Sequence, residues 1–571
     1  MPLVSHITRI RIITVCVVFF AFALVVKLFF VQIINGDDYR QEAMRQYSAP
    51  VSDVFNRGKI LWTSRDGLYS SAATLKTGAI IAINPKFLSD AEGVFKKLSS
   101  IIELDEEDFF IKAAKKADPY EIIARRVSNE DASAIESLNL PNVIISLDRW
   151  RFYPAGRRAS HVLGFVGYSG DEFLGRYGVE RFYDELLAKK NKNLYVNFFA
   201  EVFFGLSATI FEDKSLRDGD IVLSLEREVE ARLEKEISDI MEKWDSSSAG
   251  GIIINPKTGE IYAMAALPDF DPNTFNNETN SLIFSNPNVE DVYEMGSIIK
   301  PLTMAAALDT GAVTKETEYY DAGYVDLDGA HIENYDGKGR GLVPMQEVLN
   351  QSLNTGAVFI MTKMGPDKLR NYFEKFGFGE KTGIDLPNEA RGLIKNLTSA
   401  RTIEYATASF GQGIAMTPIA TARALSALGN GGLLPTPYVV SEIDYDLGFS
   451  SKTSHQAPRR VISSQTSETI TRMLVDVVDN ALLGGTVALP NYSIAAKTGT
   501  AQIANPDGGG YYDDRNLHSF FGYFPAYDPE FLIFLYTKYP KEIKYASQTL
   551  TEPFMNLTKF LIGYYNIPPD R

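Results

Sequence analysis

The stretch that decides the fold is YEMGSIIKP, residues 293–301. It places a serine and a lysine three positions apart, Ser297 and Lys300. On a helix, residues i and i+3 share a face, so the Ser297 hydroxyl and the Lys300 amine can meet. A serine becomes an effective nucleophile when a base takes its proton. A lysine is such a base when burial and a neighbouring cation lower its pKa. The pattern alone is common, and an exposed helical serine and lysine would produce it equally well.

A second candidate motif, Ser352-Leu353-Asn354, lies further along the chain, between Gln351 and Thr355. A hydroxyl and a carboxamide two positions apart on a tight turn can point into one cleft. Ser352 would then relay a proton, and Asn354 would hold an amide group of a substrate. Taken alone, the motif is explained equally well by a turn at the start of a helix.

A third candidate motif, Lys497-Thr498-Gly499-Thr500, belongs to a predicted strand. Lys497 would supply positive charge for a carboxylate and lower the pKa of Lys300. Thr498 and Thr500 offer hydroxyl groups, and Gly499 would let a substrate backbone approach the strand closely. Taken alone, this motif is typical of a turn at the end of a strand.

The composition argues against several other classes of protein. Lys and Arg number 57 and Asp and Glu 72, so the formal charge is −15, which disfavours binding to nucleic acid phosphates. Cys16 is the single cysteine, and the chain has only five histidines. No disulfide can form within the chain, no zinc-binding spacing is present, and no motif marks a carboxylate-bound metal. We therefore expect no metal and no cofactor.

The N-terminal segment predicts a membrane anchor. Residues 12–34, IITVCVVFFAFALVVKLFFVQII, are almost continuously apolar and long enough to span the hydrocarbon core as a helix. Arg9 and Arg11 precede this run, and Asp37 and Asp38 follow it. The positive-inside rule then predicts a cytoplasmic N-terminus, with the rest of the chain on the outer side of the membrane.

A cleaved signal peptide is the competing interpretation of this segment, because Ala21-Phe22-Ala23 resembles a cleavage site. The apolar run continues past that site to Ile34, which favours an uncleaved anchor. Lys27 is a charge inside the predicted span. It either faces a partner helix, as functional intramembrane charges do, or is simply tolerated on a single-pass anchor.

The length of 571 residues predicts two or more domains, because a single core does not grow that large. Before about residue 220, short β-rich runs alternate with helical stretches, and no nucleophile-plus-base pattern is present, so a spacer or interaction domain is expected. Beyond it, strands are expected near both ends and helices in the middle, which predicts one sheet built from both ends. The predicted parts are a tail over 1–11, an anchor over 12–34, a spacer domain over 37–220 and a catalytic domain over 221–571.

The three motifs together are specific. SxxK, SxN and KTG in this order resemble the signature of penicillin-binding proteins and serine β-lactamases. Further segments resemble the transpeptidase domain of that family: NPKTGEI at 255–261, AMA at 263–265, DFDPN at 269–273, SFGQG at 409–413, TP at 417–418 and SFFGYFPA at 519–526.

The N-terminal half resembles the class B, monofunctional members of the same family. The matching segments are LFFVQIINGDDY at 28–39, RGKI at 57–60, RDG at 65–67, YP at 153–154, ASHVLG at 159–164, and GVE at 178–180 followed by Tyr183. Two departures stand out. Met295 replaces the proline usual before Gly-Ser, and Trp62-Thr63-Ser64 lengthens the gap between RGKI and RDG. The resemblance covers nearly the whole chain.

This resemblance implies an α/β (α+β) transpeptidase domain, a mixed, β-rich pedestal or dimerisation domain, and one N-terminal transmembrane helix. It also implies the chemistry. Ser297 attacks the carbonyl between the two terminal D-alanines of a cell-wall stem peptide, and Lys300 is the general base. Ser352 passes the proton to the leaving D-alanine with help from Lys497. A second peptide's amine then attacks the acyl-enzyme and completes a cross-link, while β-lactams trap Ser297.

The resemblance assigns binding roles as well. The backbone N–H groups of Ser297 and Thr500 form the oxyanion hole. Thr498 and Thr500 bind the terminal carboxylate beside Gly499, and Asn354 holds a substrate amide.

Several alternatives stay open at this point. SxN and the compact pedestal resemble the division-specific class B enzyme more than the elongation enzyme. The division enzyme implies a membrane glycosyltransferase and other division proteins as partners. A D-Ala-D-Ala carboxypeptidase is the nearest enzymatic rival, and a non-catalytic division scaffold is a rival of another class. A β-lactamase is disfavoured by the anchor and pedestal, and a bifunctional wall synthase by the short region before residue 220.

Overall fold

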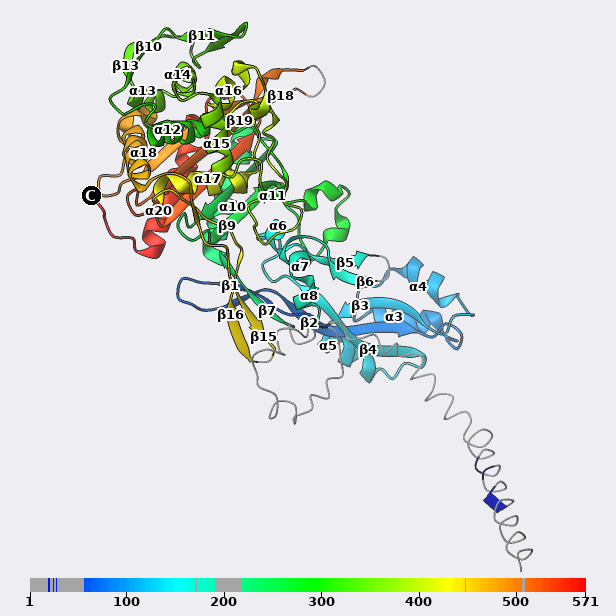
Figure 1. Cartoon of the computed structure of the whole chain (residues 1–571). Coiled ribbons are helices and arrows are strands. Elements are labelled where there is room, and N and C mark those ends of the chain that lie inside the picture. Colours follow the sequence, from blue (N-terminus) through cyan, green and yellow to red (C-terminus); the bar gives the residue numbers. More distant parts are fainter. Residues whose placement is uncertain are drawn as a thin grey trace, which may run out of the picture. The chain divides into compact units, whose positions relative to one another are not determined.

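The computed structural model describes residues 19–20, 24, 27, 56–169, 172–189, 218–446, 448–505 and 509–571. These residues fall into two compact units (Figure 1). The described part of the smaller unit is chiefly Leu75–Trp150, and the larger unit comprises Arg57–Thr74 and Arg151–Arg571. Part of the predicted spacer domain thus belongs to the same compact unit as the catalytic part. The boundaries of the domains, 37–220 and 221–571, remain a prediction.

Most of the predicted membrane anchor lies outside the described residues, as does Cys16. Phe19, Phe20, Leu24 and Lys27 are described, and all four are helical. In the part of the chain that the structure describes, no helix has the length and apolar character needed to cross a membrane.

The smaller unit packs three helices against strands. Strand β2 (Ser70–Ile83) pairs antiparallel with β3 (Glu121–Val127), with Ile83 opposite Glu121. The other elements are α3 (Ala91–Ser99), α4 (Glu106–Ala113), α5 (Asn129–Ser137) and β4 (Val143–Phe152). Their apolar faces form a separate core, which includes Ile81, Leu98, Phe109 and Ile135.

The larger unit is organised around a five-stranded antiparallel sheet of order β18-β19-β20-β8-β9. Its strands come from both ends of the predicted catalytic part: β8 (Ser248–Ile254), β9 (Ile261–Leu267), β18 (Ala495–Ala504), β19 (Tyr511–Phe524) and β20 (Phe531–Lys538). This is the sheet that the order of the predicted elements indicates. β18 forms one edge of it, which leaves that edge next to the helical middle of the chain.

Both faces of this sheet are buried (Figure 1). Helices α10 (Arg227–Trp244) and α20 (Thr551–Tyr565) share a core with Ile253 on one face. Ile252 and Ile254 belong to the main core on the other face, together with the helices of the middle segment. Burial on both faces explains why β8 reads as an apolar run without the alternation typical of a half-exposed strand.

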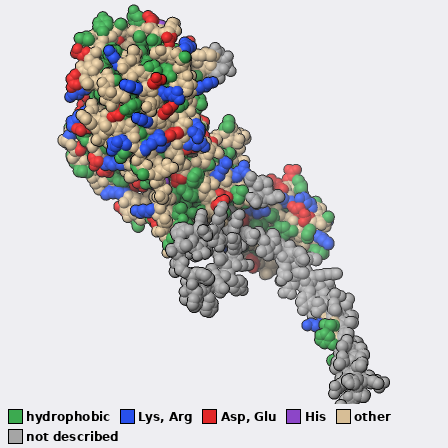
Figure 2. Space-filling model, in the orientation of Figure 1, with side chains coloured by type: hydrophobic (Ala, Val, Ile, Leu, Met, Phe, Trp, Pro, Cys, Tyr) green, Lys and Arg blue, Asp and Glu red, His purple; other side chains and the backbone are tan. Residues whose placement is uncertain are grey.

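The middle segment supplies the remaining helices and some short strands. They are α11 (Pro287–Glu290), α12 (Lys300–Asp309), β10 (Glu318–Asp321), β11 (Tyr324–Leu327), β12 (Ala330–Glu333), β13 (Gly341–Pro344), α13 (Met345–Asn350), α14 (Asn354–Met364), α15 (Pro366–Lys375), α16 (Thr402–Ala408), α17 (Pro418–Gly429), β14 (Leu433–Leu434), β17 (Arg459–Arg460), α18 (Ser464–Asp476) and α19 (Ala546–Thr549). Over the visible face of this unit, acidic and basic side chains are interspersed (Figure 2).

A second set of strands lies in the N-terminal part of the larger unit. β1 (Ile60–Thr63) pairs antiparallel with the start of β2 and parallel with β7 (Gly219–Glu226). β7 also pairs with β15 (Val440–Tyr445), which forms a hairpin with β16 (Phe449–Lys452). Trp62, part of the unusual insertion, belongs to β1 and is buried. The short elements nearby are α6 (Ser160–Leu163), β5 (Val166–Ser169), β6 (Glu172–Gly175), α7 (Gly178–Phe182) and α8 (Asp184–Leu187).

Three of the N-terminal motifs meet at one buried carboxylate, Glu180, which is 0% exposed. Arg57 Nε lies 2.5 Å from one of its oxygens, and Arg151 Nε lies 2.6 Å from the other. The Tyr153 hydroxyl donates to the second oxygen at 3.2 Å. Burial alone would raise the pKa of Glu180, but the two guanidinium groups outweigh it and lower that pKa. The motifs are therefore structural and hold the N-terminal part of this unit together.

We expect Glu180→Ala to lower the free energy of unfolding by about 3–5 kcal/mol, because it removes the carboxylate between two buried guanidinium groups and leaves Arg57 with Asp184 as its carboxylate partner. Urea denaturation followed by tryptophan fluorescence measures the change. The matched control is Arg157→Ala, which removes a more exposed ion pair with Asp269 and is expected to cost less than about 1 kcal/mol. Equal losses in the two variants would contradict a structural role for the cluster.

Candidate active site

Ser297 lies on the 3-10 helix η5 (Gly296–Ile299), which leads directly into α12. The turn is fixed by close main-chain contacts. Gly296 has a φ of +64°, and a Cβ there would come within 2.7 Å of the Thr500 carbonyl oxygen. The Gly296 N–H donates to the Gly411 carbonyl at 3.1 Å. The nucleophile turn is thus pressed between β18 and the loop of Gly411, at places where only glycine fits.

Lys300 is 1% exposed. Its Nζ donates to the carbonyl oxygen of Ser352 at 2.5 Å and to the Ser352 hydroxyl at 3.2 Å. Burial, and then the charge of Lys497, hold the pKa of Lys300 well below its ordinary value. A neutral amine in this position can accept a proton from a neighbouring hydroxyl, which is the role predicted for it.

Lys497 is the second buried lysine of the site and is 3% exposed. Burial lowers its pKa to about 7, and its Nζ donates to the Thr498 carbonyl at 3.1 Å. An anionic group bound beside it would favour the protonated form. The site therefore combines one amine suited to be a base with one suited to bind a carboxylate.

Ser352 lies on the turn between α13 and α14, two residues before Asn354. Ser352 has a φ of +54°, a strained conformation for a residue with a side chain. Asn354 is the first residue of α14, and its Nδ2 donates to the Glu333 carbonyl at 2.8 Å. The motif is thus both a helix-start turn and part of the site, because Lys300 contacts it directly.

Thr498, Gly499 and Thr500 lie on the edge strand β18. A Cβ at Gly499 would come within 2.4 Å of Ser519 Oγ and 2.8 Å of the Met295 carbonyl oxygen. Glycine is therefore required for packing of β18 against the Ser297 turn, a reason that differs from the predicted approach of a substrate. The substrate-binding roles of the three residues stay predictions.

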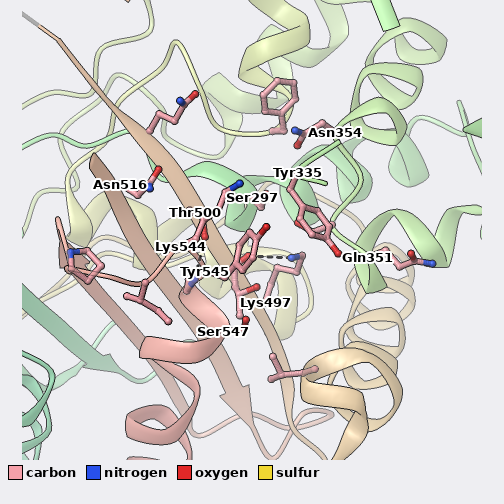
Figure 3. Close-up of a pocket in the computed structure, with 18 of the residues that line it drawn as sticks. Ser297, Tyr335, Gln351, Asn354, Lys497, Thr500, Asn516, Lys544, Tyr545 and Ser547 are labelled. Atoms are coloured by element: carbon pink, nitrogen blue, oxygen red, sulfur yellow. Dashed lines mark hydrogen bonds between the residues drawn. The ribbon is translucent and has the colours of Figure 1, made fainter. Parts of the chain in front are cut away.

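One cavity of about 1060 Å³ brings most of the predicted residues together (Figure 3). Ser297, Ser352, Asn354, Lys497, Thr498 and Thr500 line it. Lys300 and Gly499 are not among its lining residues in the described part of the chain. In that same part, no three His, Cys, Asp or Glu side chains gather closely enough to hold a metal ion.

Sequence reasoning missed other residues of the cavity wall. Tyr335 follows β12, and Tyr545 precedes α19 (Figure 3). Their rings meet edge to face with centroids 5.6 Å apart. The remaining missed residues include Gln351, Gln502, Asn516, Lys544 and Ser547. For Tyr545 the sequence offered one signal, an aromatic residue directly after a lysine in the loop that follows the last strand. For Tyr335 no local pattern indicates a place in the site.

Comparison with protein families accounts for most of the chain. Residues 249–558 match the penicillin-binding protein transpeptidase domain, and residues 54–198 match the penicillin-binding protein dimerisation domain. The chain belongs to the class B penicillin-binding proteins. This match confirms the resemblance inferred from the motifs. It also confirms the predicted transpeptidase fold with an N-terminal dimerisation domain.

Curated relatives of this penicillin-binding protein extend along most of its length. Stage V sporulation protein D of Bacillus subtilis is 33% identical over 93% of this chain and 81% of its own. Peptidoglycan D,D-transpeptidase FtsI of Escherichia coli is 27% identical, covering 94% and 87%. Peptidoglycan D,D-transpeptidase MrdA of Acinetobacter baumannii is 29% identical, covering 78% and 72%. The predicted enzyme class, a serine-type D,D-transpeptidase, is confirmed.

Solved structures confirm the fold of this penicillin-binding protein. Penicillin binding protein 2X of Streptococcus thermophilus superposes with a TM-score of 0.73 at 20% identity, covering 90% of this chain and 81% of the other. Penicillin binding protein 3 of Mycobacterium tuberculosis, complexed with aztreonam, has a TM-score of 0.68 at 22% identity, covering 90% and 97%.

The electrostatic contact between the two lysines predicts a shift in pH dependence. Lys300 accepts a proton only when neutral, so acylation by a penicillin should fall as the pH drops through its pKa. In Lys497→Gln the neighbouring cation is lost, the pKa of Lys300 rises, and the midpoint of this fall should move to higher pH. Affinity for a carboxylate ligand should also drop about ten- to a hundredfold, because one charged hydrogen bond is removed.

The measurement is the limiting rate of acylation by a fluorescent penicillin across the pH range. Lys544→Gln is the matched control, since Lys544 lines the same cavity but does not contribute to the shift of Lys300. Its midpoint should equal that of the unsubstituted protein. A midpoint of Lys497→Gln that stays in place or moves to lower pH contradicts the assignment of Lys300 as the base.

Proposed function

We propose that this class B penicillin-binding protein cross-links stem peptides of the cell wall through an acyl-enzyme at Ser297, and that it does so at the division septum. The observation that carries the chemistry is the contact of buried Lys300 with Ser352, which lines the same cavity as Ser297, Lys497 and Thr500. A base with a lowered pKa, a hydroxyl relay and a carboxylate-binding cation are then within one site.

Acylation begins when the Ser297 oxygen attacks the carbonyl carbon between the two terminal D-alanines. Lys300 takes the hydroxyl proton as the O–C bond forms. When the C–N bond breaks, Ser352 delivers a proton to the leaving D-alanine, and Lys300 replaces the proton on Ser352. The 3.2 Å contact between Lys300 Nζ and Ser352 Oγ supports this relay. Ser297 is left as an ester of the shortened stem peptide.

Deacylation reverses these proton transfers. The amine of a second stem peptide attacks the ester carbon and gives up a proton, and Ser297 leaves with a proton supplied by Lys300. The product is an amide that links the two peptides. The backbone N–H groups of Ser297 and Thr500 would stabilise the oxyanion in both steps, a contribution of about 3 kcal/mol per donor. The close packing of Gly296 on the Thr500 carbonyl supports this pairing of the two segments.

The septal role rests on the resemblance of SxN and the compact pedestal to the division-specific enzyme. The names of the relatives include division, sporulation and other transpeptidases, so they support the chemistry more than the place. With the apolar run 12–34 as a single-pass anchor, the catalytic part acts outside the cell membrane, where stem peptides are. The partners proposed are a membrane glycosyltransferase and other division proteins.

Penicillin labelling and product analysis test the chemistry. The unsubstituted protein should bind a fluorescent penicillin covalently, and Ser297→Ala should lose the label completely because the attacking oxygen is gone. With a dimerisable stem peptide as substrate, we expect a cross-linked product and free D-alanine. Free D-alanine without a cross-linked product would identify a carboxypeptidase. A wild-type protein that takes no label would instead favour a non-catalytic division scaffold.

Depletion of the protein in its own cells tests the place of action. Loss of a septal transpeptidase should yield filaments, since cells elongate without dividing. Complementation with the Ser297→Ala variant is the control, and it should leave the filaments unchanged. Round cells after depletion would instead assign the enzyme to elongation.

A further inference from the structure

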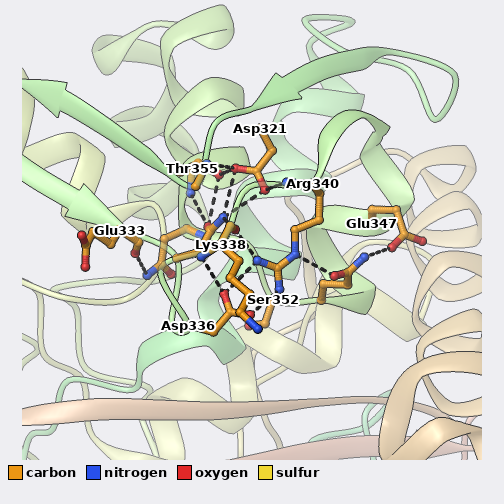
Figure 4. A network of polar contacts seen from close by, with 12 residues as sticks. Asp321, Glu333, Asp336, Lys338, Arg340, Glu347, Ser352 and Thr355 are labelled. Atoms are coloured by element: carbon orange, nitrogen blue, oxygen red, sulfur yellow. Dashed lines mark hydrogen bonds and ion pairs between the residues drawn. The ribbon is translucent and has the colours of Figure 1, made fainter.

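An arm of the larger unit lies against the catalytic turn of Ser352 and is not part of the three motifs. We call residues 318–344, which contain β10 to β13, the active-site arm. β10 pairs with β13, and β11 pairs with β12. Figure 4 shows the polar contacts of this arm around Ser352 and Thr355. They centre on a single carboxylate, Asp321.

Asp321 ends β10 and is 1% exposed. Asn334 Nδ2 donates to both of its oxygens at 3.0 Å, and Thr355 Oγ1 donates at 2.8 Å. The backbone N–H groups of Gly323 and Arg340 donate at 2.9 and 3.1 Å. These uncharged donors satisfy the buried carboxylate, which would otherwise be costly to bury. The Gly323 and Arg340 donors belong to the backbone of the arm itself. Thr355 lies outside the arm, directly after the Ser352-Leu353-Asn354 motif.

Asn334 connects this carboxylate to α14. Its Oδ1 accepts from the backbone N–H of Asn354 at 3.0 Å and of Thr355 at 3.3 Å. These are the first two amides of α14, which have no partner within the helix. Leu353 occupies the N-cap position and has no side chain able to accept from them. Asn334 therefore caps the helix from the arm, and Asp321 fixes the orientation of the Asn334 amide.

The arm also holds the other end of the turn. Arg340 Nε donates to Gln351 Oε1 at 2.9 Å, while its other nitrogens pair with Asp336 at 2.8 Å. Ser352 lies between these two anchor points in its strained conformation, with φ +54°. Its carbonyl oxygen in turn accepts from Lys300. A shift of the arm would consequently move the groups that contact the base.

We propose that Asp321 is a positioning residue for acylation, holding Asn334 on the first turn of α14 so that Ser352 stays in contact with Lys300. The proposal rests on the acylation of Ser297 proposed above. Asp321 does not line the cavity in the described part of the chain, so it acts through Asn334 and Thr355. It should govern the rate of the covalent step more than the affinity for the ligand.

The test is Asp321→Asn in the full chain, with a fluorescent penicillin as the probe. The amide turns an N–H₂ group toward the donors of Asn334 or Arg340 and breaks the set of contacts at nearly constant volume. We expect the limiting acylation rate to fall at least about tenfold, because small misplacements of reacting groups are costly. The half-saturating concentration should change by less than about threefold, because uniform binding is retained.

Two further variants make the result specific. Asp326→Asn is the matched control, since Asp326 lies on the same arm, is 67% exposed and contacts His331. It should leave the rate unchanged. Adding Asn334→Asp to Asp321→Asn restores a carboxylate facing an amide, and should recover part of the lost rate. Asn334→Asp alone, which places two carboxylates together, should be slow.

A limiting rate of Asp321→Asn equal to that of the unsubstituted protein would overturn the proposal. So would a smaller labelled fraction that reacts at the normal rate, because that outcome means a merely structural role. If Asp321→Asn fails to fold, Thr355→Val is the substitute, because it removes one of the donors to Asp321. It should also lower the limiting acylation rate, but by less than Asp321→Asn. An unsubstituted protein that takes no label at Ser297 refutes the proposed function itself, whereas normal labelling with an unaffected Asp321→Asn refutes only this inference.

Discussion

The structure of the active site depends on the burial of one amine. Lys300 is buried, and its burial and the nearby charge of Lys497 both lower its pKa. Its Nζ donates to both the carbonyl and the hydroxyl of Ser352. A charged lysine would be costly in this environment, so burial itself provides the base. The double-sided sheet, the glycine-lined turn of Ser297 and the helix α12 all serve to keep that amine in place.

The sequence predicted the catalytic residues better than it predicted the residues that hold them in place. Six of the eight predicted site residues line one cavity, and a seventh, Lys300, contacts one of the six, Ser352. The sheet built from both ends of the catalytic part also followed from the order of apolar runs. These features were predictable because motif spacing and strand periodicity are local properties of the chain.

What could not be predicted depends on contacts between distant segments. Asn334 caps a helix that starts twenty residues later, and nothing around either residue indicates the pairing. The need for glycine at 499 comes from Ser519 and Met295, which only the folded chain brings near. The grouping of 57–74 with the catalytic part likewise involves distant segments, because β1 pairs with β7 and Arg57 reaches Glu180.

The glycine contacts around Ser297 have a consequence for how susceptibility to β-lactams can change. Added atoms at Gly296, Gly411 or Gly499 would collide with main chain, so adaptive variation at these positions would damage the natural reaction as much as inhibition. Side chains on the cavity rim, such as Tyr335 and Tyr545, are not constrained in this way. Heritable resistance in this enzyme should therefore arise at the rim, while the turn that carries the nucleophile stays unchanged.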